Sequence, residues 1–141
     1  MLFRSVALLL LALSIYRVYQ QTRRPISDYL SELTGPKYTD CGSYEVGIDG
    51  WEKQQDQVLD CAVTAARKPA PFVFIEIDHE IDSTVYTGWV RKKNGVLLRY
   101  AYDSQPCGGP GCREIFSTKP CPSPNLHIKD GRVRFLCAKP E

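Results

Sequence analysis

The feature that most constrains the fold is a set of three β-rich runs within residues 72–102. The runs are dominated by β-branched and aromatic side chains, and turn sequences separate them. The second turn contains Asn94-Gly95, a pair favoured in two-residue type I′ turns because both positions need positive φ. This pattern predicts an antiparallel β-meander.

An apolar stripe at helical spacing predicts one main helix before the meander. The stripe comprises Trp51, Val58, Leu59, Ala62, Val63 and Ala66. We expect Asp49 to cap the helix and Glu52 to complete a variant of the capping box. Residues 52–57 are expected to face solvent, and Pro69 ends the helix.

The order of the elements predicts an α+β fold: one main helix packed on an antiparallel β-meander of four to five strands, stapled by disulfides. A short helix is expected within residues 25–33, a short strand over residues 41–48, a fourth meander strand over residues 113–117 and a hairpin around Asp130-Gly131. The expected domains are a signal peptide (1–14), an N-terminal arm with the short helix (15–40) and a single α+β domain (41–141).

The N-terminus has the pattern of a secretory signal peptide. Arg4 precedes an apolar run over residues 6–16, which is shorter than the roughly 20 residues that span a bilayer. Ala12-x-Ser14 suits signal peptidase, so the mature chain is expected to begin near Ile15. The alternative is an uncleaved N-terminal anchor. The sequence therefore predicts a secreted or periplasmic protein with no stable membrane span after cleavage.

An even number of cysteines in a small exported chain predicts a disulfide framework. The six cysteines allow fifteen connectivities. We favour the sequence-local set: Cys41 with Cys61, Cys107 with Cys112, and Cys121 with Cys137. The alternative is a zinc site built on Cys107 and Cys112, with Cys121, Cys137, His79 or His127 completing it.

Centring the hairpin on Asn94-Gly95 places Trp89 opposite Tyr100 and sorts the apolar side chains onto two faces. One face collects Phe72, Phe74, Trp89, Tyr100 and Tyr102; the other collects Val73, Ile75, Ile77, Tyr86, Val90, Leu97 and Ala101. We expect the main helix to pack on the second of these faces. The remaining face is then covered by the N-terminal arm and the C-terminal segment, or it is a binding patch.

Few residues suggest catalysis or metal binding. Glu76, Asp78, Glu80 and Asp82 alternate along one stretch and are the candidates for a metal site, although their spacing is not that of an EF-hand. His79 has no evident catalytic partner, and no phosphate-binding or dinucleotide-binding motif occurs. We therefore expect no cofactor and no resident metal.

The Gly-rich loop of residues 107–112 is the candidate binding site, because a short bridge would pre-organise it. Its residues are Cys107, Gly108, Gly109, Pro110, Gly111 and Cys112, with Tyr100 and Tyr102 nearby. The C-x4-C loop leading into a strand resembles the inhibitory loop of the periplasmic vertebrate-lysozyme inhibitors, which carries a His and charged residues where this chain has Gly, Gly, Pro and Gly. The helix-then-meander order is similar to the cystatin fold, without its Gln-x-Val-x-Gly signature.

The expected function is that of a small exported binding or inhibitor-like domain with an unknown protein or small-molecule partner. The formal net charge is +2, or +1 once Arg4 is removed with the leader, so no basic surface for nucleic acid is expected. The alternative is a small hydrolase or metal-dependent enzyme that uses Glu76, Asp78 and His79.

Overall fold

The computed structural model describes residues 6, 8, 10–15, 23–109, 111–129 and 132–137. The elements in chain order are α2 (Ile26–Thr34), β1 (Thr39–Glu45), α3 (Trp51–Ala66), β2 (Phe72–His79), β3 (Thr84–Arg91), β4 (Leu97–Asp103), β5 (Ile115–Pro120), β6 (Pro124–Lys129) and β7 (Arg132–Cys137). The α+β class is confirmed, because a five-stranded sheet carries the main helix and β6 and β7 form a separate hairpin.

The sheet is mixed. Strands β2 to β5 form the predicted antiparallel meander. Strand β1 adds to the free edge of β2 in parallel, which the sequence pattern did not indicate. The parallel pairing follows from the connection, because α3 carries the chain back along the sheet before β2 begins.

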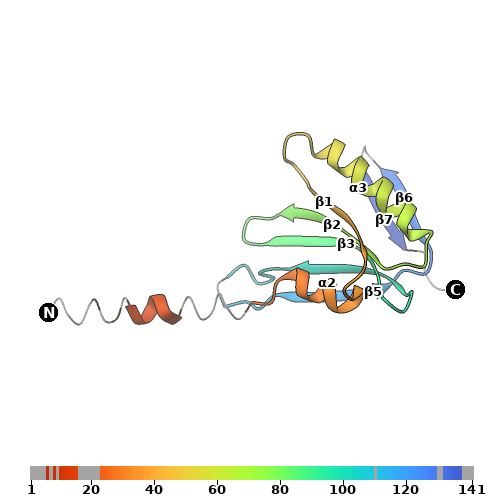
Figure 1. Ribbon diagram of the computed structural model, residues 1–141. Coiled ribbons are helices and arrows are strands. Elements are labelled where there is room, and N and C mark those ends of the chain that lie inside the picture. Colours follow the sequence, from red (N-terminus) through yellow and green to blue (C-terminus); the bar gives the residue numbers. More distant parts are fainter. Residues whose placement is uncertain are drawn as a thin grey trace.

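The two faces of the sheet bury two separate cores, and Figure 1 shows α2 and α3 on opposite sides of the sheet. Helix α3 packs through Val58, Leu59 and Ala62 on the face that includes Phe72, Phe74, Trp89 and Leu97. Helix α2 packs through Leu30 on the face that includes Val73, Val90, Leu98 and Tyr100. As expected, the N-terminal arm covers the face that the main helix leaves open, but that face carries Val73 and not Phe72. The expectation that the C-terminal segment covers the same face is wrong, because this segment joins the α3-side core through Cys121 and Cys137.

The predicted assignment of the main helix to the Val73 face is wrong. Val58 instead lies in the core that contains Phe72 and Phe74. Sequence alternation separates the two sides of a strand, but it does not say which helix lies on which side. The burial of Val58 is as expected, since 6% of the residue is exposed.

The predicted register between β3 and β4 is also wrong by one residue. The Asn94-Gly95 turn is part of a longer loop: the Lys92 N–H donates to the Val96 carbonyl, and Gly95 has φ of +86°. The three residues between that pair make a three-residue hairpin loop with a left-handed glycine, a common alternative to the two-residue type I′ turn. Tyr100 consequently lies opposite Gly88 instead of Trp89.

This slip moves Tyr100 and Tyr102 from the expected Phe72 face to the opposite one, and Leu97 and Ala101 to the face of α3. The two tyrosines are 1% and 6% exposed. The Tyr100 side chain extends across Gly88, and its hydroxyl donates to the Phe74 carbonyl on β2 at 2.8 Å. The glycine thus makes room for an aromatic ring that hydrogen-bonds two strands away.

Helix α3 begins and ends close to the expected residues but is capped differently. Its N-cap is Gly50 with φ of +78°, and no side-chain cap bond forms, so the predicted Asp49 cap is wrong. Gln55, expected in the solvent-facing part, is 5% exposed. It is buried because it shares the sheet-facing side of the helix with Val58, Leu59 and Ala62, and its side chain hydrogen-bonds the Tyr44 hydroxyl.

All six cysteines are in disulfides, paired as in the sequence-local set: Cys41–Cys61, Cys107–Cys112 and Cys121–Cys137. The first bridge ties β1 to α3, and both half-cystines lie at the α3-side core. The third ties the end of β5 to the end of β7, which places the C-terminal hairpin on the same side of the sheet as α3 (Figure 1). Oxidised pairs leave no thiolates for the zinc alternative.

Half of the predicted signal peptide, residues 1–5, 7 and 9, lies outside the described residues. Residues 6, 8 and 10–15 are helical and exposed. Among the described residues, no helix has both the length and the apolar character needed to cross a membrane.

Candidate functional site

Two segments that are far apart in sequence meet at one end of the sheet. The first is the β2–β3 turn, residues 80–83. The second is the segment that follows β4, residues 104–109, 111 and 112. Together we call them the sheet-end surface. A hollow of about 530 Å³ lies between them, lined by residues including His79, Asp82 and Gly108. The acidic turn and the disulfide loop, two independent candidates in the sequence, therefore form one surface.

Side-chain contacts hold the two segments together. The Gln105 amide nitrogen donates to the Asp82 carbonyl at 2.6 Å, and its amide oxygen accepts from the Arg23 guanidinium at 3.0 Å. The Ser104 hydroxyl accepts from the Thr84 N–H at 2.9 Å. At Gly108, a Cβ would lie 3.3 Å from Asp82 Oδ2, so the backbone of the loop is packed directly against the turn.

The N-terminal arm is fastened to the same end of the sheet. The Tyr102 hydroxyl donates to the Arg24 carbonyl, and the Arg24 N–H donates to the Glu114 carboxylate, both at 3.1 Å. Burial, followed by the nearby Glu114 carboxylate, raises the pKa of the Tyr102 hydroxyl. Desolvation acts to raise the pKa of Glu114, but hydrogen bonds from backbone N–H groups, including that of Arg24, outweigh it and the pKa is lowered.

Ile81, at the tip of the turn, is 100% exposed. The turn is closed behind it by a hydrogen bond from the Glu80 N–H to the Ser83 carbonyl at 2.9 Å. A fully exposed aliphatic side chain gains nothing for the fold of the isolated chain, because none of its apolar area is removed from water. It is available to a partner.

The predicted binding residues divide between surface and core. Cys107, Gly108, Gly109 and Gly111 lie in the described part of the loop, and all but Gly109 are exposed. Cys112 is 5% exposed. Tyr100 and Tyr102 are buried by the register described above, so the prediction that they flank a binding loop is wrong. Pro110 lies outside the described residues.

The four alternating carboxylates do not converge. Glu76 accepts hydrogen bonds from the Tyr44 hydroxyl and from the Thr87 hydroxyl, the latter at 3.2 Å, on the α3 side of the sheet. Asp82 lies instead beside Gly108 at the end of the sheet. No group of three or more potential metal-binding side chains occurs among the described residues. Strand alternation also separates Glu76 from His79, so the predicted catalytic cluster of Glu76, Asp78 and His79 does not assemble.

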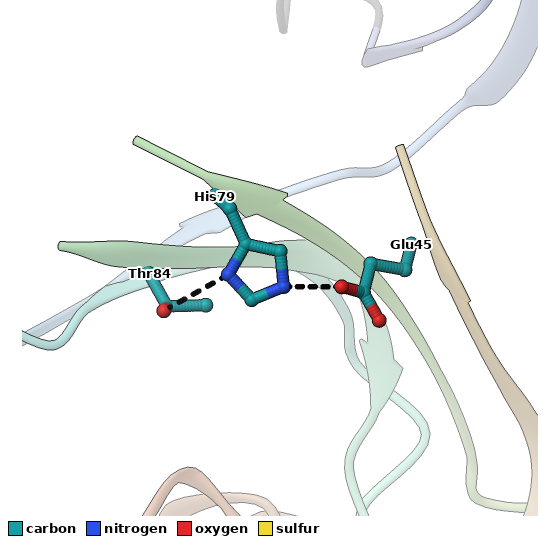
Figure 2. A network of polar contacts seen from close by, with 3 residues as sticks. All are labelled: Glu45, His79 and Thr84. Atoms are coloured by element: carbon teal, nitrogen blue, oxygen red, sulfur yellow. Dashed lines mark hydrogen bonds and ion pairs between the residues drawn. The ribbon is translucent and has the colours of Figure 1, made fainter. Parts of the chain in front are cut away.

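His79 instead joins three strands. Figure 2 shows its imidazole between the Glu45 carboxylate and the Thr84 hydroxyl. Nε2 lies 2.5 Å from Glu45 Oε1, and Nδ1 lies 3.3 Å from Thr84 Oγ1. An ionised carboxylate only accepts, so Nε2 carries the proton towards Glu45 and, in the neutral ring, Nδ1 accepts from Thr84. This is the arrangement of a hydroxyl, a base and a group that orients the base.

Sequence reasoning missed Glu45, Thr84 and Ile81. Thr84 pairs with His79 across a four-residue turn, so a correct hairpin register would have found it. Ile81 was an apolar residue within an acidic turn, which was itself a signal. Glu45 reaches His79 through the parallel β1–β2 pairing, which no local pattern encodes.

No protein-family model, no curated protein and no solved structure matches this chain.

Proposed function

We propose that this protein is an exported binding domain, of an inhibitor-like kind, whose partner contacts the sheet-end surface. One observation carries the proposal: a turn that presents a fully exposed Ile81 lies directly beside a glycine-rich loop closed by the Cys107–Cys112 bridge. Both segments are anchored to strands, so little order must be gained on binding. Loops held on a rigid scaffold are common recognition sites.

Export is part of the same proposal. The three disulfides need an oxidising compartment to persist, and the basic-then-apolar N-terminus is typical of a secreted or periplasmic precursor. The partner is then a protein or small molecule of that compartment.

The expected mode of recognition follows from the chemistry of the surface. Ile81 enters an apolar pocket of the partner, since buried aliphatic and aromatic anchors dominate most interfaces. The Gly109 carbonyl already accepts from the Cys112 N–H at 3.1 Å. The Gly109 N–H and the backbone groups of Gly111 supply hydrogen bonds to the partner, because nothing lies within 4 Å of the position of a Cβ at either residue.

Site-specific photo-crosslinking on the full-length chain in its native host tests the proposal. A photoreactive residue at Ile81 or Gly109 is expected to capture the same partner. The control is Val96, which is 44% exposed in the turn at the opposite end of the sheet. Ile81→Asp should abolish capture from the Gly109 position and leave the melting temperature unchanged. Equal capture from Val96, or capture unaffected by Ile81→Asp, would refute the proposal.

A second candidate function, ester or amide hydrolysis, is favoured by one observation, the placement of His79 between Glu45 and Thr84. In that reaction Thr84 Oγ1 attacks the acyl carbon, and His79 Nδ1 takes the hydroxyl proton and passes it to the leaving group. Water then hydrolyses the acyl-threonine. An oxyanion hole requires backbone N–H groups that are free to donate to the reacting oxygen. Hydrolysis is the weaker candidate because the N–H groups of Thr84 and Glu80 already donate to Ser104 and Ser83.

Hydrolysis of p-nitrophenyl acetate tests the second candidate. Thr84→Val and His79→Gln should each reduce a measurable turnover by 10²-fold or more if the pair is catalytic. Turnover that survives both substitutions would exclude this site.

A further inference from the structure

A second hollow, separate from the sheet-end surface, opens on the face of the sheet that carries α3. Helix α3 and the C-terminal hairpin lie on that face, and the core beneath α3 reaches Leu97 at the start of β4. Arg99 on β4 and Ser117 and Lys119 on β5 remain exposed. The hollow measures about 230 Å³ and is lined by Arg99, Tyr100, Ala101, Ser117 and Lys119. Tyr100 is buried on the other side of the sheet, so the exposed side chains of the hollow come from the other four residues.

Two cations lie side by side in the lining of this hollow. Arg99 on β4 and Lys119 on β5 are directly opposite partners in the antiparallel ladder. Side chains in such a position have Cβ atoms about 5 Å apart, and like charges there are destabilising. The fold therefore places two positive charges side by side, and a neutral side chain at either position would make the folded state more stable.

No neighbouring carboxylate of the described residues neutralises them. The ion pairs among the described residues join Arg24 to Glu32 and His79 to Glu45, so neither Arg99 nor Lys119 takes part in one. On the same face, Glu76 accepts from the hydroxyls of Tyr44 and Thr87. Asp103 lies four residues from Arg99 along β4, and its Oδ1 accepts from the Gln105 N–H at 2.9 Å.

The remaining side chains complete a donor set. Ser117 lies opposite Ala101, two residues along the ladder from the cation pair and on the same face. Its exposed hydroxyl can donate into the same hollow. The small Ala101 keeps the floor of the hollow open. Guanidinium, ammonium and hydroxyl groups together match the oxygens of a phosphate or a carboxylate.

We propose that Arg99, Lys119 and Ser117 form a binding site for an oxyanion, a phosphate or a carboxylate group of a small molecule. The bound anion supplies the negative charge that the ladder lacks and removes the repulsion between the two cations. This site does not depend on the sheet-end surface, so either proposal can fail without the other.

NMR titration of the disulfide-intact protein tests the site. Sodium phosphate and sodium acetate are each titrated against sodium chloride at equal ionic strength, which distinguishes phosphate from carboxylate binding. Saturable shifts are expected at the amides of residues 99, 101, 117 and 119. The double variant Arg99→Gln, Lys119→Gln should weaken binding by roughly tenfold or more. The control Lys53→Gln, Lys68→Gln removes the same charge from exposed positions on other elements and should retain binding.

A charge reversal gives an independent result. Lys119→Glu places a carboxylate opposite Arg99, so the melting temperature in chloride should rise above that of the wild type, and the response to phosphate and acetate should disappear. Shifts that do not saturate, equal binding by the two double variants, or a lower melting temperature for Lys119→Glu would each overturn the proposal.

Discussion

Substitution of Gly88 by alanine is expected to be among the most damaging single-methyl changes in this protein. A Cβ at Gly88 would lie 2.2 Å from the Phe74 carbonyl oxygen and 2.9 Å from the Tyr100 hydroxyl, whereas ordinary contact begins at 3.4 Å. Neither neighbour can yield easily. The carbonyl belongs to the backbone of β2, an interior strand of the sheet, and Tyr100 is 1% exposed.

The cost has two sources. Forcing β2 and β3 apart in a packed core costs about 1–3 kcal/mol. The same movement breaks the 2.8 Å bond from the Tyr100 hydroxyl to the Phe74 carbonyl, and a buried acceptor left unsatisfied costs about 1–3 kcal/mol more. We therefore expect Gly88→Ala to lower the free energy of unfolding by about 2–6 kcal/mol, a large share of the 5–15 kcal/mol typical of a small domain.

Urea unfolding with the disulfides intact, followed by the fluorescence of the buried Trp89, measures this cost. Gly109→Ala is the matched control: nothing lies within 4 Å of its Cβ position, so its effect should be within about 0.5 kcal/mol. Tyr100→Phe isolates the hydrogen bond. The two substitutions should be less than additive when combined, because the bond can be lost only once. A Gly88→Ala variant as stable as Gly109→Ala would refute the packing argument.

Four further results are expected. Burial raises the pKa values of Tyr44 and Tyr100, and the Glu76 carboxylate adds to the effect at Tyr44. Just above pH 10 these two tyrosines therefore lose protons only in the unfolded chain, and the free energy of unfolding should fall by up to about 1.4 kcal/mol per pH unit for each. The fall should be shallower in Tyr44→Phe. Val58→Asp should destabilise by more than about 3 kcal/mol in thermal unfolding, because it buries an unpaired charge, and an unchanged melting temperature would contradict the α3 packing. Thiol titration of the denatured, unreduced chain should find almost no free thiol, and replacing both half-cystines of the five-residue bridge Cys107–Cys112 by serine should cost less than replacing those of longer bridges. N-terminal sequencing of the exported protein should start near Ile15, and an intact Met1 would favour the anchor instead.

The local chemistry of the chain anticipated several features of the candidate site. Glycines between closely spaced cysteines indicated a constrained loop, and alternating carboxylates after a β-rich run indicated a polar turn. The sequence did not place these two features together. Their adjacency depends on the order of the strands in the sheet, and this is decided by contacts between distant residues.

The sequence by itself determined the element types, the α+β class and the presence of a disulfide framework, and it favoured the pairing that the structure then confirmed. These depend on periodicity, turn residues and short spacings, which act over a few neighbouring positions. Tertiary structure alone decided the parallel addition of β1, the register of β4 and the face on which each helix packs. The reason is physical, because Asn94-Gly95 is compatible with both a two-residue and a three-residue loop. The packing of Tyr100 over Gly88 selects the three-residue loop, since only this register lets the Tyr100 hydroxyl reach the Phe74 carbonyl two strands away.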